Sequence, residues 1–350
     1  MNEQEKYMHR CIELASNGLG SVAPNPLVGA VLVKDEKIIG EGFHHRFGEA
    51  HAEVNAINSF LKSSGNKSEE LSHTTLYVNL EPCNHDGKTP PCTELIIKHK
   101  IPRVIIGCAD PNENVNGHGI EALRKAGCEV VTGVLEKECR ELNRRFLTYH
   151  IKKRPYIILK FAQSKDGFLA PEKFADKEEA WITNQWSRKL VHKWRREEQA
   201  VMIGTTTALT DNPLLTTRFW HGKNPLRIII DKTLRLPPSL NIFNSEAKTI
   251  IFNASKNETK DNLKYVKINF SSAPEEILHV LYSEQIQSVI IEGGAKLLNS
   301  FIENNLWDEA RVFSGNKFFI RGIKAPAITI SPSTEENIEG DALTIFRNTF

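Results

Sequence analysis

The chain has 350 residues, of which 40% are hydrophobic and 25% charged, and its formal net charge is +2. This length exceeds that of one ordinary domain, so we expect two domains. The near-neutral charge gives no electrostatic reason to expect nucleic acid or an anionic membrane as the main partner. No apolar run approaches the roughly 20 residues of a membrane span, and the amino-terminal stretch lacks the apolar core of a secretory signal. The composition therefore predicts a cytoplasmic globular protein.

Residues 1–148 alternate helix and strand patterns, which predicts a three-layer α/β/α domain. The expected helices have apolar residues three and four positions apart and cover 1–18, 51–62, 92–100 and 119–127. The expected strands are rich in β-branched residues and cover 28–33, 37–45, 74–80, 103–108 and 128–134.

A basic segment that ends in proline, 149–155, is the expected linker, and a second α/β series fills 156–350. Its expected strands are 156–162, 200–204, 226–231, 248–253 and 288–294. Its expected helices are 183–199, 274–284 and 295–304. Cysteine and tryptophan support this division, because all six cysteines precede residue 140 and all five tryptophans follow residue 180. In a reducing compartment, neighbouring cysteines are expected to bind metal rather than form disulfides.

His51 and Glu53 stand at the start of an expected helix, and Cys83 and Cys92 follow an expected strand. A His-x-Glu followed by Pro-Cys and a second cysteine is the pattern of zinc deaminases. Two thiolates and one imidazole hold zinc and leave its fourth position to water, whose pKa falls to about 7 in known sites. We therefore predict zinc ligands at His51, Cys83 and Cys92, and a proton shuttle at Glu53.

Simpler interpretations stay open at this point. A His-x-Glu is common on a solvated helix face, and two cysteines are ordinary core residues. A purely structural zinc needs a fourth ligand, for which His85 is the candidate. The segment between the cysteines, 84–91, is longer than the two residues typical of cytidine deaminases, and it carries several hydrogen-bonding side chains. It is therefore interpreted as a substrate-recognition loop beside the metal.

The first half resembles the bifunctional riboflavin-biosynthesis deaminase/reductase family in four stretches: "PNPLVGAVLV" (24–33), "GEGFHHRFGEAHAE" (40–53), "EPCNHDGKTPPC" (81–92) and "ADPNENVNGHG" (109–119). The resemblance implies a cytidine-deaminase-like fold with the zinc ligands and shuttle named above. It also implies substrate contacts at Asn25, His44, His85, Lys88, Thr89, Asp110 and Asn112. For Asp110 and Asn112, turn formation around Pro111 is the competing interpretation.

The second half lacks a Gly-x-Gly-x-x-Gly after an expected strand, so an ordinary dinucleotide-binding site is not indicated. The nearest feature is Glu292-Gly293-Gly294, at a strand-to-helix turn where backbone N–H groups can approach a phosphate. By itself this pattern favours a tight structural turn.

The resemblance extends through the second half in "LKFAQSKDG", "WITN", "RKLVHKWR", "GTTTALTDNPLLTTR", "PLRIIID" and "IIEGG". It implies a dihydrofolate-reductase-like α/β domain that uses NADPH. The implied NADPH contacts are Ala162, Trp181, Thr207, Asp211, Gly293 and Gly294. The implied substrate contacts are Arg195, Leu215, Arg218 and Glu292. Arginines suit a phosphate group, but a solvated face for the arginines and a core position for Trp181 are the competing interpretations.

The second half departs from the family pattern in two places. Lys165 stands where the family usually has leucine, and the loop after Gly167 looks long. Glu179 stands where a small polar residue is expected to contact substrate, and an acidic group there would repel a phosphate.

We therefore expect a two-step enzyme. A zinc-dependent aminohydrolase would deaminate a diaminopyrimidinone ribosylamine phosphate, and an NADPH-dependent oxidoreductase would reduce its ribosyl side chain to ribityl. The expected partner is this phosphorylated pyrimidine, with neither nucleic acid nor membrane, and a homo-oligomer is allowed. Two alternatives stay open: a nucleoside- or tRNA-type zinc deaminase with an appended non-catalytic domain, and a zinc-stabilised interaction module.

Overall fold

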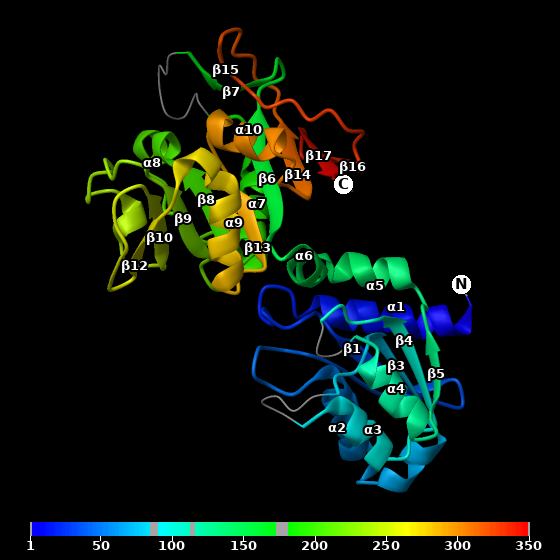
Figure 1. Ribbon diagram of the computed structural model, residues 1–350. Coiled ribbons are helices and arrows are strands. Elements are labelled where there is room, and N and C mark those ends of the chain that lie inside the picture. The colour runs from blue at the N-terminus through cyan, green and yellow to red at the C-terminus, as the bar shows by residue number, and fades with distance from the viewer. Residues whose placement is uncertain (1, 85–89, 113–115, 173–180, 349–350) are drawn as a thin grey trace. The chain divides into compact units, whose positions relative to one another are not determined.

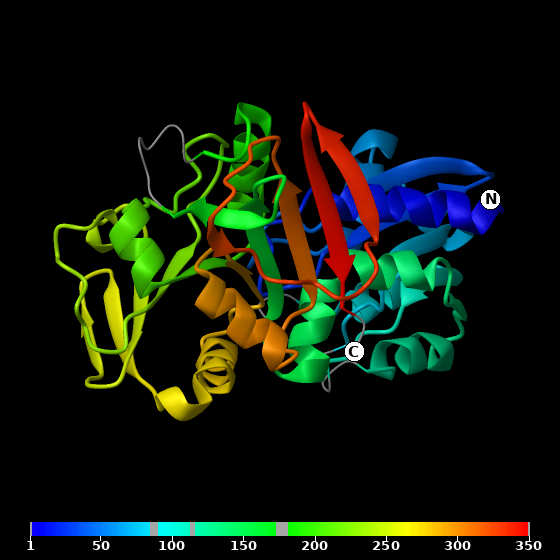
Figure 2. The same cartoon turned by 90° about the horizontal axis from the view of Figure 1, so that it is seen from above.

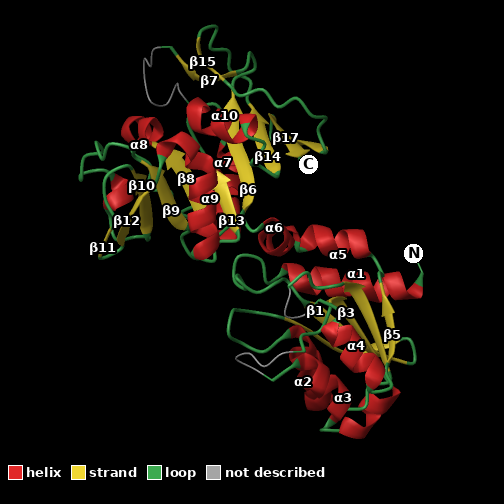
Figure 3. Ribbon diagram, viewed as in Figure 1, coloured by secondary structure: helices red, strands yellow, loops and turns green. Residues whose placement is uncertain are grey.

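The computed structural model describes residues 2–84, 90–112, 116–172 and 181–348. The chain forms two compact units, Met1–Lys152 and Lys153–Phe350, which we call unit 1 and unit 2. Each unit has a central sheet with helices on both faces (Figures 1 and 3). Within the described ranges, no helix combines the length and the apolar character that a membrane crossing requires.

Unit 1 is built on a five-stranded sheet with the order β2-β1-β3-β4-β5. Strand β1 pairs antiparallel with β2 and β3, while β3, β4 and β5 are parallel. The strands are β1 (Gly29–Lys34), β2 (Lys37–Phe43), β3 (Thr75–Leu80), β4 (Arg103–Cys108) and β5 (Glu129–Thr132). The helices are α1 (Glu3–Ser16), α2 (Ala52–Ser64), α3 (Cys92–Lys98), α4 (His118–Lys125), α5 (Glu136–Leu142) and α6 (Arg144–Lys152), with a 3-10 helix at Ser68–His73.

Alternate strand residues of unit 1 separate two apolar cores, because successive side chains of a strand point to opposite faces. On β1, Leu32 joins the core against α2, α3 and α4. Its neighbour Val31 joins the core against α1 and α5. Helix α6 extends over part of the segment 149–155, and it ends where Lys153 adopts a left-handed φ of 52°.

Unit 2 is built on a ten-stranded sheet with the order β11-β12-β10-β9-β8-β13-β6-β14-β17-β16. The seven strands from β12 to β14 in this order are parallel, and the hairpin β16–β17 adds antiparallel strands at one edge (red in Figure 2). The strands are β6 (Tyr156–Gln163), β8 (Ala200–Gly204), β9 (Leu226–Ile230), β10 (Thr249–Asn253), β11 (Glu258–Lys260), β12 (Leu263–Lys267), β13 (Ser288–Ile291), β14 (Glu309–Ser314), β16 (Thr334–Ile338) and β17 (Asp341–Arg347). A separate pair joins β7 (Phe168–Pro171) to β15 (Gly322–Lys324).

The sheet of unit 2 is covered by α7 (Gln185–Glu197) and α8 (Thr205–Asp211) on one face and by α9 (Ala273–Ser283) and α10 (Ala295–Glu303) on the other. The central parallel strands are buried on both faces and read as continuous apolar runs, as in "YIIL" of β6. Short 3-10 helices lie at Asn241–Phe243 and Phe270–Ser272.

Gly42 on β2 sets how closely α2 approaches the sheet of unit 1. A Cβ atom at this position would lie 2.5 Å from the Ala56 backbone nitrogen and 2.6 Å from the Asn55 Cβ. The contacts are with helix backbone, which cannot move aside cheaply. The absence of a side chain at Gly42 therefore brings α2, and His51 at its N-terminus, against the strands.

We expect Gly42→Ala to lower the free energy of unfolding of unit 1 by about 1–3 kcal/mol, the usual cost of overpacking. All five tryptophans lie in unit 2. In urea unfolding, the transition of unit 1 followed by far-UV circular dichroism should therefore move to a lower urea concentration. The transition followed by tryptophan fluorescence should stay unchanged. Lys62→Ala, on the exposed face of α2, is the control and should stay within about 0.5 kcal/mol. An unchanged dichroism midpoint in Gly42→Ala would contradict this packing argument.

Candidate active sites

Three metal-binding side chains of unit 1 converge from separate elements. His51 is the N-cap residue of α2, Cys83 lies just beyond β3, and Cys92 opens α3. Their ligand atoms all lie within 4.8 Å of one another. His51 Nδ1 is 3.3 Å from Cys92 Sγ and 3.5 Å from Cys83 Sγ. A tetrahedral zinc bound to one nitrogen and two sulfurs separates N from S by about 3.6 Å, so the donor set and its spacing fit zinc.

Local hydrogen bonds set up Cys83 as a thiolate ligand, whereas the hydrogen bond to Cys83 and burial raise the pKa of Cys92. A side-chain hydrogen bond from Cys92 lowers the pKa of Cys83 to about 4, although burial opposes this shift. The backbone N–H of Cys92 also lies 3.4 Å from Cys83 Sγ, at the N-terminus of α3. The thiolate is the form that binds metal.

Glu53 lies in the first turn of α2, two residues after His51, and is only 3% exposed. Burial, followed by the nearby Cys83, raises the pKa of its carboxyl group to about 7. A carboxyl group that titrates near neutral pH can both accept and release a proton, which general acid–base catalysis requires.

The side chains of His44 and Asn25 form a hydrogen-bonded pair beside the predicted ligand His51. His44 Nδ1 lies 3.0 Å from the Ala50 carbonyl oxygen. Because a carbonyl oxygen can only accept a hydrogen bond, Nδ1 carries the proton. Nε2 then accepts from the Asn25 side-chain amide at 3.0 Å. The His44 and His51 rings meet edge to face at 5.5 Å between centroids. Burial lowers the pKa of His44 and keeps the ring neutral, so the orientation of the Asn25 amide is fixed.

Two buried asparagines that sequence reasoning missed hold the loop that carries Asn25. The Asn143 side chain accepts from Leu27 N at 2.8 Å and donates to Leu27 O at 2.9 Å. Asn79 donates to the same carbonyl at 3.0 Å and accepts from Gly29 N at 2.8 Å. Neither residue shares a motif with Asn25, so their role becomes visible only when the strands are paired.

Asp110 and Asn112 follow β4, at the carboxyl end of the sheet. Asp110 is 6% exposed, and burial raises the pKa of its carboxyl group to about 6. The Asp110 Oδ1 accepts from the Asn112 backbone N–H at 2.8 Å, a contact typical of a turn around Pro111. Three predicted contacts of this site, His85, Lys88 and Thr89, lie outside the described residues.

In unit 2, the predicted residues Arg195 and Glu292 form a buried ion pair between α7 and the end of β13. Arg195 Nε and Nη2 donate to the two Glu292 oxygens at 2.6 and 2.7 Å, and Nη1 donates to Thr216 O at 3.2 Å. Burial alone raises the pKa of Glu292, but the Arg195 charge outweighs it and holds the pKa at about 2. Since Arg195 is committed to these partners, its main contribution is to fix the Glu292 carboxylate.

Lys160 on β6 supplies a further buried cation near this pair and was missed by sequence reasoning. Burial lowers the pKa of its ammonium group, which the Glu292 carboxylate partly offsets. The signal was present in the sequence, since a lysine in the apolar run "YIILKFA" is unusual for a strand buried on both faces.

Leu215 and Arg218 lie in the loop after α8. Leu215 is 2% exposed and has a left-handed φ of 53°. The Arg218 guanidinium stacks over the Phe219 ring at 4.9 Å. Burial and then the charge of Arg195 lower the pKa of Arg218, which indicates that the two cations share one region. Such a region suits an anionic group of a ligand.

The predicted NADPH contacts come from several elements of unit 2. Ala162 lies on β6, Thr207 and Asp211 lie on α8, and Gly293 and Gly294 form the turn into α10. A Cβ at Gly293 would lie 2.9 Å from Thr207 Oγ1, so this turn and Thr207 are in contact. Gly294 has a φ of 74°, which favours glycine.

Trp181 is 49% exposed, with the Arg188 guanidinium 4.9 Å above its ring. A core position for this residue is therefore wrong. Glu179, which departs from the family pattern, lies outside the described residues.

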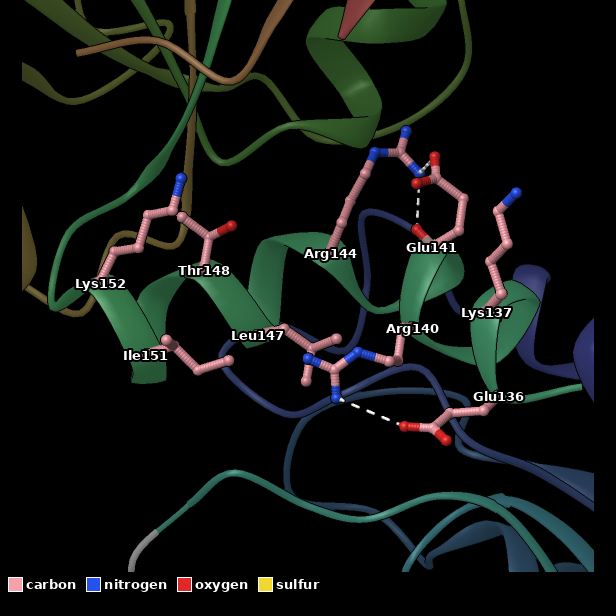
Figure 4. A pocket seen from close by; sticks show the side chains of 9 residues that line it. All are labelled: Glu136, Lys137, Arg140, Glu141, Arg144, Leu147, Thr148, Ile151 and Lys152. Carbon is pink, nitrogen blue, oxygen red and sulfur yellow. Dashed lines mark hydrogen bonds and ion pairs between the residues drawn. The ribbon is translucent and has the colours of Figure 1, made fainter. Parts of the chain in front are cut away.

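A surface hollow along α5 and α6 contains none of the predicted site residues (Figure 4). Its lining residues are Glu136, Lys137, Arg140, Glu141, Arg144, Leu147, Thr148, Ile151 and Lys152. Arg140 pairs with Glu136 at 4.0 Å and Arg144 pairs with Glu141 at 3.3 Å. These acidic residues offset part of the positive charge of the hollow. We assign no substrate to it.

Comparison with known proteins assigns a family to each unit. Residues 1–108 match the cytidine and deoxycytidylate deaminase zinc-binding region, and residues 155–319 match the RibD C-terminal domain. These matches, with the His-Cys-Cys site and its buried carboxyl group, define a zinc-dependent deaminase unit joined to a reductase unit.

The full-length relatives carry the same combination. The chain is 42% identical over 341 residues to the riboflavin biosynthesis protein RibD of Aquifex aeolicus, covering 96% of this chain and 93% of the relative. It is 34% identical to RibD of Escherichia coli, covering 95% and 93%. A solved deaminase/reductase from Thermotoga maritima superposes with a TM-score of 0.89 at 40% identity, covering 99% and 98%. The chain belongs to the RibD family of riboflavin biosynthesis proteins.

The expected fold class and the two enzymatic activities are thereby confirmed. The chain is a bifunctional enzyme of riboflavin biosynthesis that uses zinc in its deaminase unit and NADPH in its reductase unit. The two alternatives, a nucleoside- or tRNA-type deaminase and a non-catalytic zinc module, are not favoured.

We expect purified protein to hold zinc, and Cys92→Ser to weaken zinc binding by at least about 100-fold, because a neutral hydroxyl replaces a thiolate ligand. Metal content after dialysis, measured by plasma mass spectrometry, tests this. Cys128→Ser is the matched control, because Cys128 Sγ donates to the Ile101 carbonyl at 3.2 Å and Cys128 does not belong to the His51, Cys83 and Cys92 cluster. Equal zinc retention by both variants would contradict the ligand assignment.

A pH-dependent stability follows from His192 on α7, which is 4% exposed. Burial, then Arg195 and Arg218, lower its pKa to about 4. An unfolded histidine binds a proton near pH 6.5, so the unfolded state binds more protons than the folded state between these values. Stability therefore decreases as the pH falls through this range.

When the pH is lowered from 7.5 to 5, His192 should lower the free energy of unfolding of unit 2 by about 2 kcal/mol. Urea unfolding followed by tryptophan fluorescence at several pH values measures this. His192→Gln should flatten the dependence, whereas His279→Gln, at an exposed position of α9, should retain it. The same pH dependence in His192→Gln and wild type would refute the assignment.

Proposed function

We propose that unit 1 deaminates a diaminohydroxyphosphoribosylaminopyrimidine and that unit 2 reduces the product, 5-amino-6-(5-phosphoribosylamino)uracil, the pair of activities carried in the name of the Thermotoga maritima relative. The observation that carries the first step is the convergence of His51, Cys83 and Cys92 beside the buried Glu53 carboxyl group. These three residues would hold zinc, which when bound would supply an acidified water for hydrolysis.

Glu53 handles the protons of the first reaction. With a pKa of about 7, its carboxylate can take a proton from the attacking water and deliver it to the departing amino group, which leaves as ammonia. Asn25 and His44 would hold the pyrimidine on one side, and Asp110 and Asn112 on the other. The predicted contacts His85, Lys88 and Thr89 belong to the same proposal.

The second reaction is proposed for the region around Glu292. NADPH supplies the hydride when bound, and Ala162, Trp181, Thr207 and Asp211 would hold it with the Gly293–Gly294 turn. Support comes from helix α10, which begins at this turn and whose first backbone N–H groups could bind a cofactor phosphate.

The substrate of the reductase would lie between Leu215, Arg218 and Glu292. Because Arg195 is paired with Glu292, the positive charge available to a substrate phosphate comes mainly from Arg218. Glu292, held rigid by Arg195, can accept hydrogen bonds from sugar hydroxyl groups.

We also propose a cytoplasmic location and a small phosphorylated pyrimidine as the main partner, with no role for nucleic acid. The six cysteines form no disulfide, which supports the cytoplasmic location. The net charge of +2 supports the absence of a nucleic-acid partner. A homo-oligomer is compatible with the proposal.

The decisive variant is Glu53→Gln, which keeps the size of the side chain and removes its ability to shuttle a proton. Ammonia release from the pyrimidine substrate should fall by about 10²–10⁴-fold in kcat. NADPH oxidation with the deaminated compound should be unchanged, which shows that the chain is folded. Deamination at the wild-type rate by zinc-loaded Glu53→Gln would refute the assigned role.

A further inference from the structure

The carboxylate of Glu81, just beyond β3, is buried, and within the described part of the chain it accepts hydrogen bonds from four main-chain N–H groups. Glu81 is 4% exposed. Its Oε2 accepts from the N–H groups of Asp110 at 3.2 Å and Gly117 at 3.1 Å. Its Oε1 accepts from Gly119 at 3.0 Å and Ile120 at 3.2 Å. Four N–H donors distributed over both oxygens use the full accepting capacity of an ionised carboxylate.

These bonds supply the N-terminal cap that α4 does not make for itself. Gly117, the N-cap residue of α4, has no side chain and a φ of 86°. The first N–H groups of a helix have no partner within it. Glu81 binds two of them from another element, and its negative charge is favourable at this end of the helix dipole.

Glu81 also connects two parts of the deaminase site. It lies two residues before the ligand Cys83, and its own N–H bonds to the Cys108 carbonyl at 3.0 Å, at the end of β4. Through the Asp110 N–H it holds the start of the segment that carries Asp110 and Asn112. Gly119 packs against the same turn, since a Cβ there would lie 2.2 Å from the Pro82 carbonyl oxygen.

We propose that Glu81 is a positioning residue of the deaminase: it fixes Asp110 and Asn112 relative to Cys83, and thereby sets where the pyrimidine ring lies over the metal site. This inference rests on the proposed substrate contacts of Asp110 and Asn112. Glu81 itself touches neither the substrate nor the metal. Its effect is on the geometry of binding, in which a displacement of about 1 Å can cost about 100-fold in rate.

Glu81→Gln is the sharpest test, because the amide has the same shape but only one accepting oxygen. Its NH₂ group would face two of the four N–H donors, so the loop must shift. The expected result is a fall of about 10–100-fold in deaminase kcat/KM, with most of the loss in KM and with zinc content and NADPH oxidation unchanged. A catalytic role would instead reduce kcat at an unchanged KM.

The matched control is Glu121→Gln, which removes the same charge one residue beyond Ile120. The Glu121 carboxylate pairs with Lys125 at 2.7 Å on the surface of α4. This variant should match the wild type in KM, kcat and zinc content. If it shows the same rise in KM as Glu81→Gln, the effect comes from charge near α4 and the proposal is wrong.

A measurement on the wild-type protein covers the case in which Glu81→Gln does not fold. Amide hydrogen exchange should show the Gly119 and Ile120 N–H groups protected, although first-turn amides usually exchange freely. Free exchange there would overturn the proposal, as would Glu81→Gln with unchanged KM or with a loss that follows zinc loss. A wild-type protein without deaminase activity would instead overturn the proposed function, so the two failures are distinguishable.

Discussion

The turn that follows β3 is the constraint on which the deaminase unit depends. Within three residues it supplies Glu81, whose carboxylate holds the loop after β4 and the start of α4, and Cys83, which completes the ligand set with His51 and Cys92. Because these residues are joined by two peptide units, the predicted metal ligand Cys83 and the loop after β4 share one support. Gly119 packs over Pro82 in this turn and leaves no room for a side chain.

Both units place their chemistry where parallel strands end, which is where open α/β sheets bind ligands. In unit 1, Cys83 follows β3 and Asp110 follows β4, while His51 and Glu53 come from the start of α2. In unit 2, Glu292 follows β13, and Thr207 lies on the helix that follows β8. In each unit a buried carboxylate is held by several donors before any ligand is bound, so its position does not depend on the ligand. Glu81 is held by main-chain N–H groups, and Glu292 by the guanidinium of Arg195.

The sequence predicted the residues whose chemistry is set by short motifs, and it missed those that act through distant backbone. His51, Cys83 and Cys92 were predicted to lie together because zinc restricts both the type and the order of its ligands, and the structure brings them together. Glu81 and Asn79 were missed because their partners lie 29 to 39 and 50 to 52 positions away, and nothing in the local pattern indicates them. The edge strands β11 and β16 were also not predicted, because their side chains are nearly all exposed and give no alternating apolar pattern.

The central claim is that three side chains, from the N-cap of α2, the turn after β3 and the start of α3, hold one zinc with an open position. X-ray data collected on either side of the zinc absorption edge, from crystals of the metal-loaded protein, test it most directly. The account predicts one anomalous peak in unit 1, about 2.1 Å from His51 Nδ1 and about 2.3 Å from the Sγ atoms of Cys83 and Cys92, with no fourth protein ligand. A peak elsewhere, or one closed by a further side chain such as His85, would contradict it.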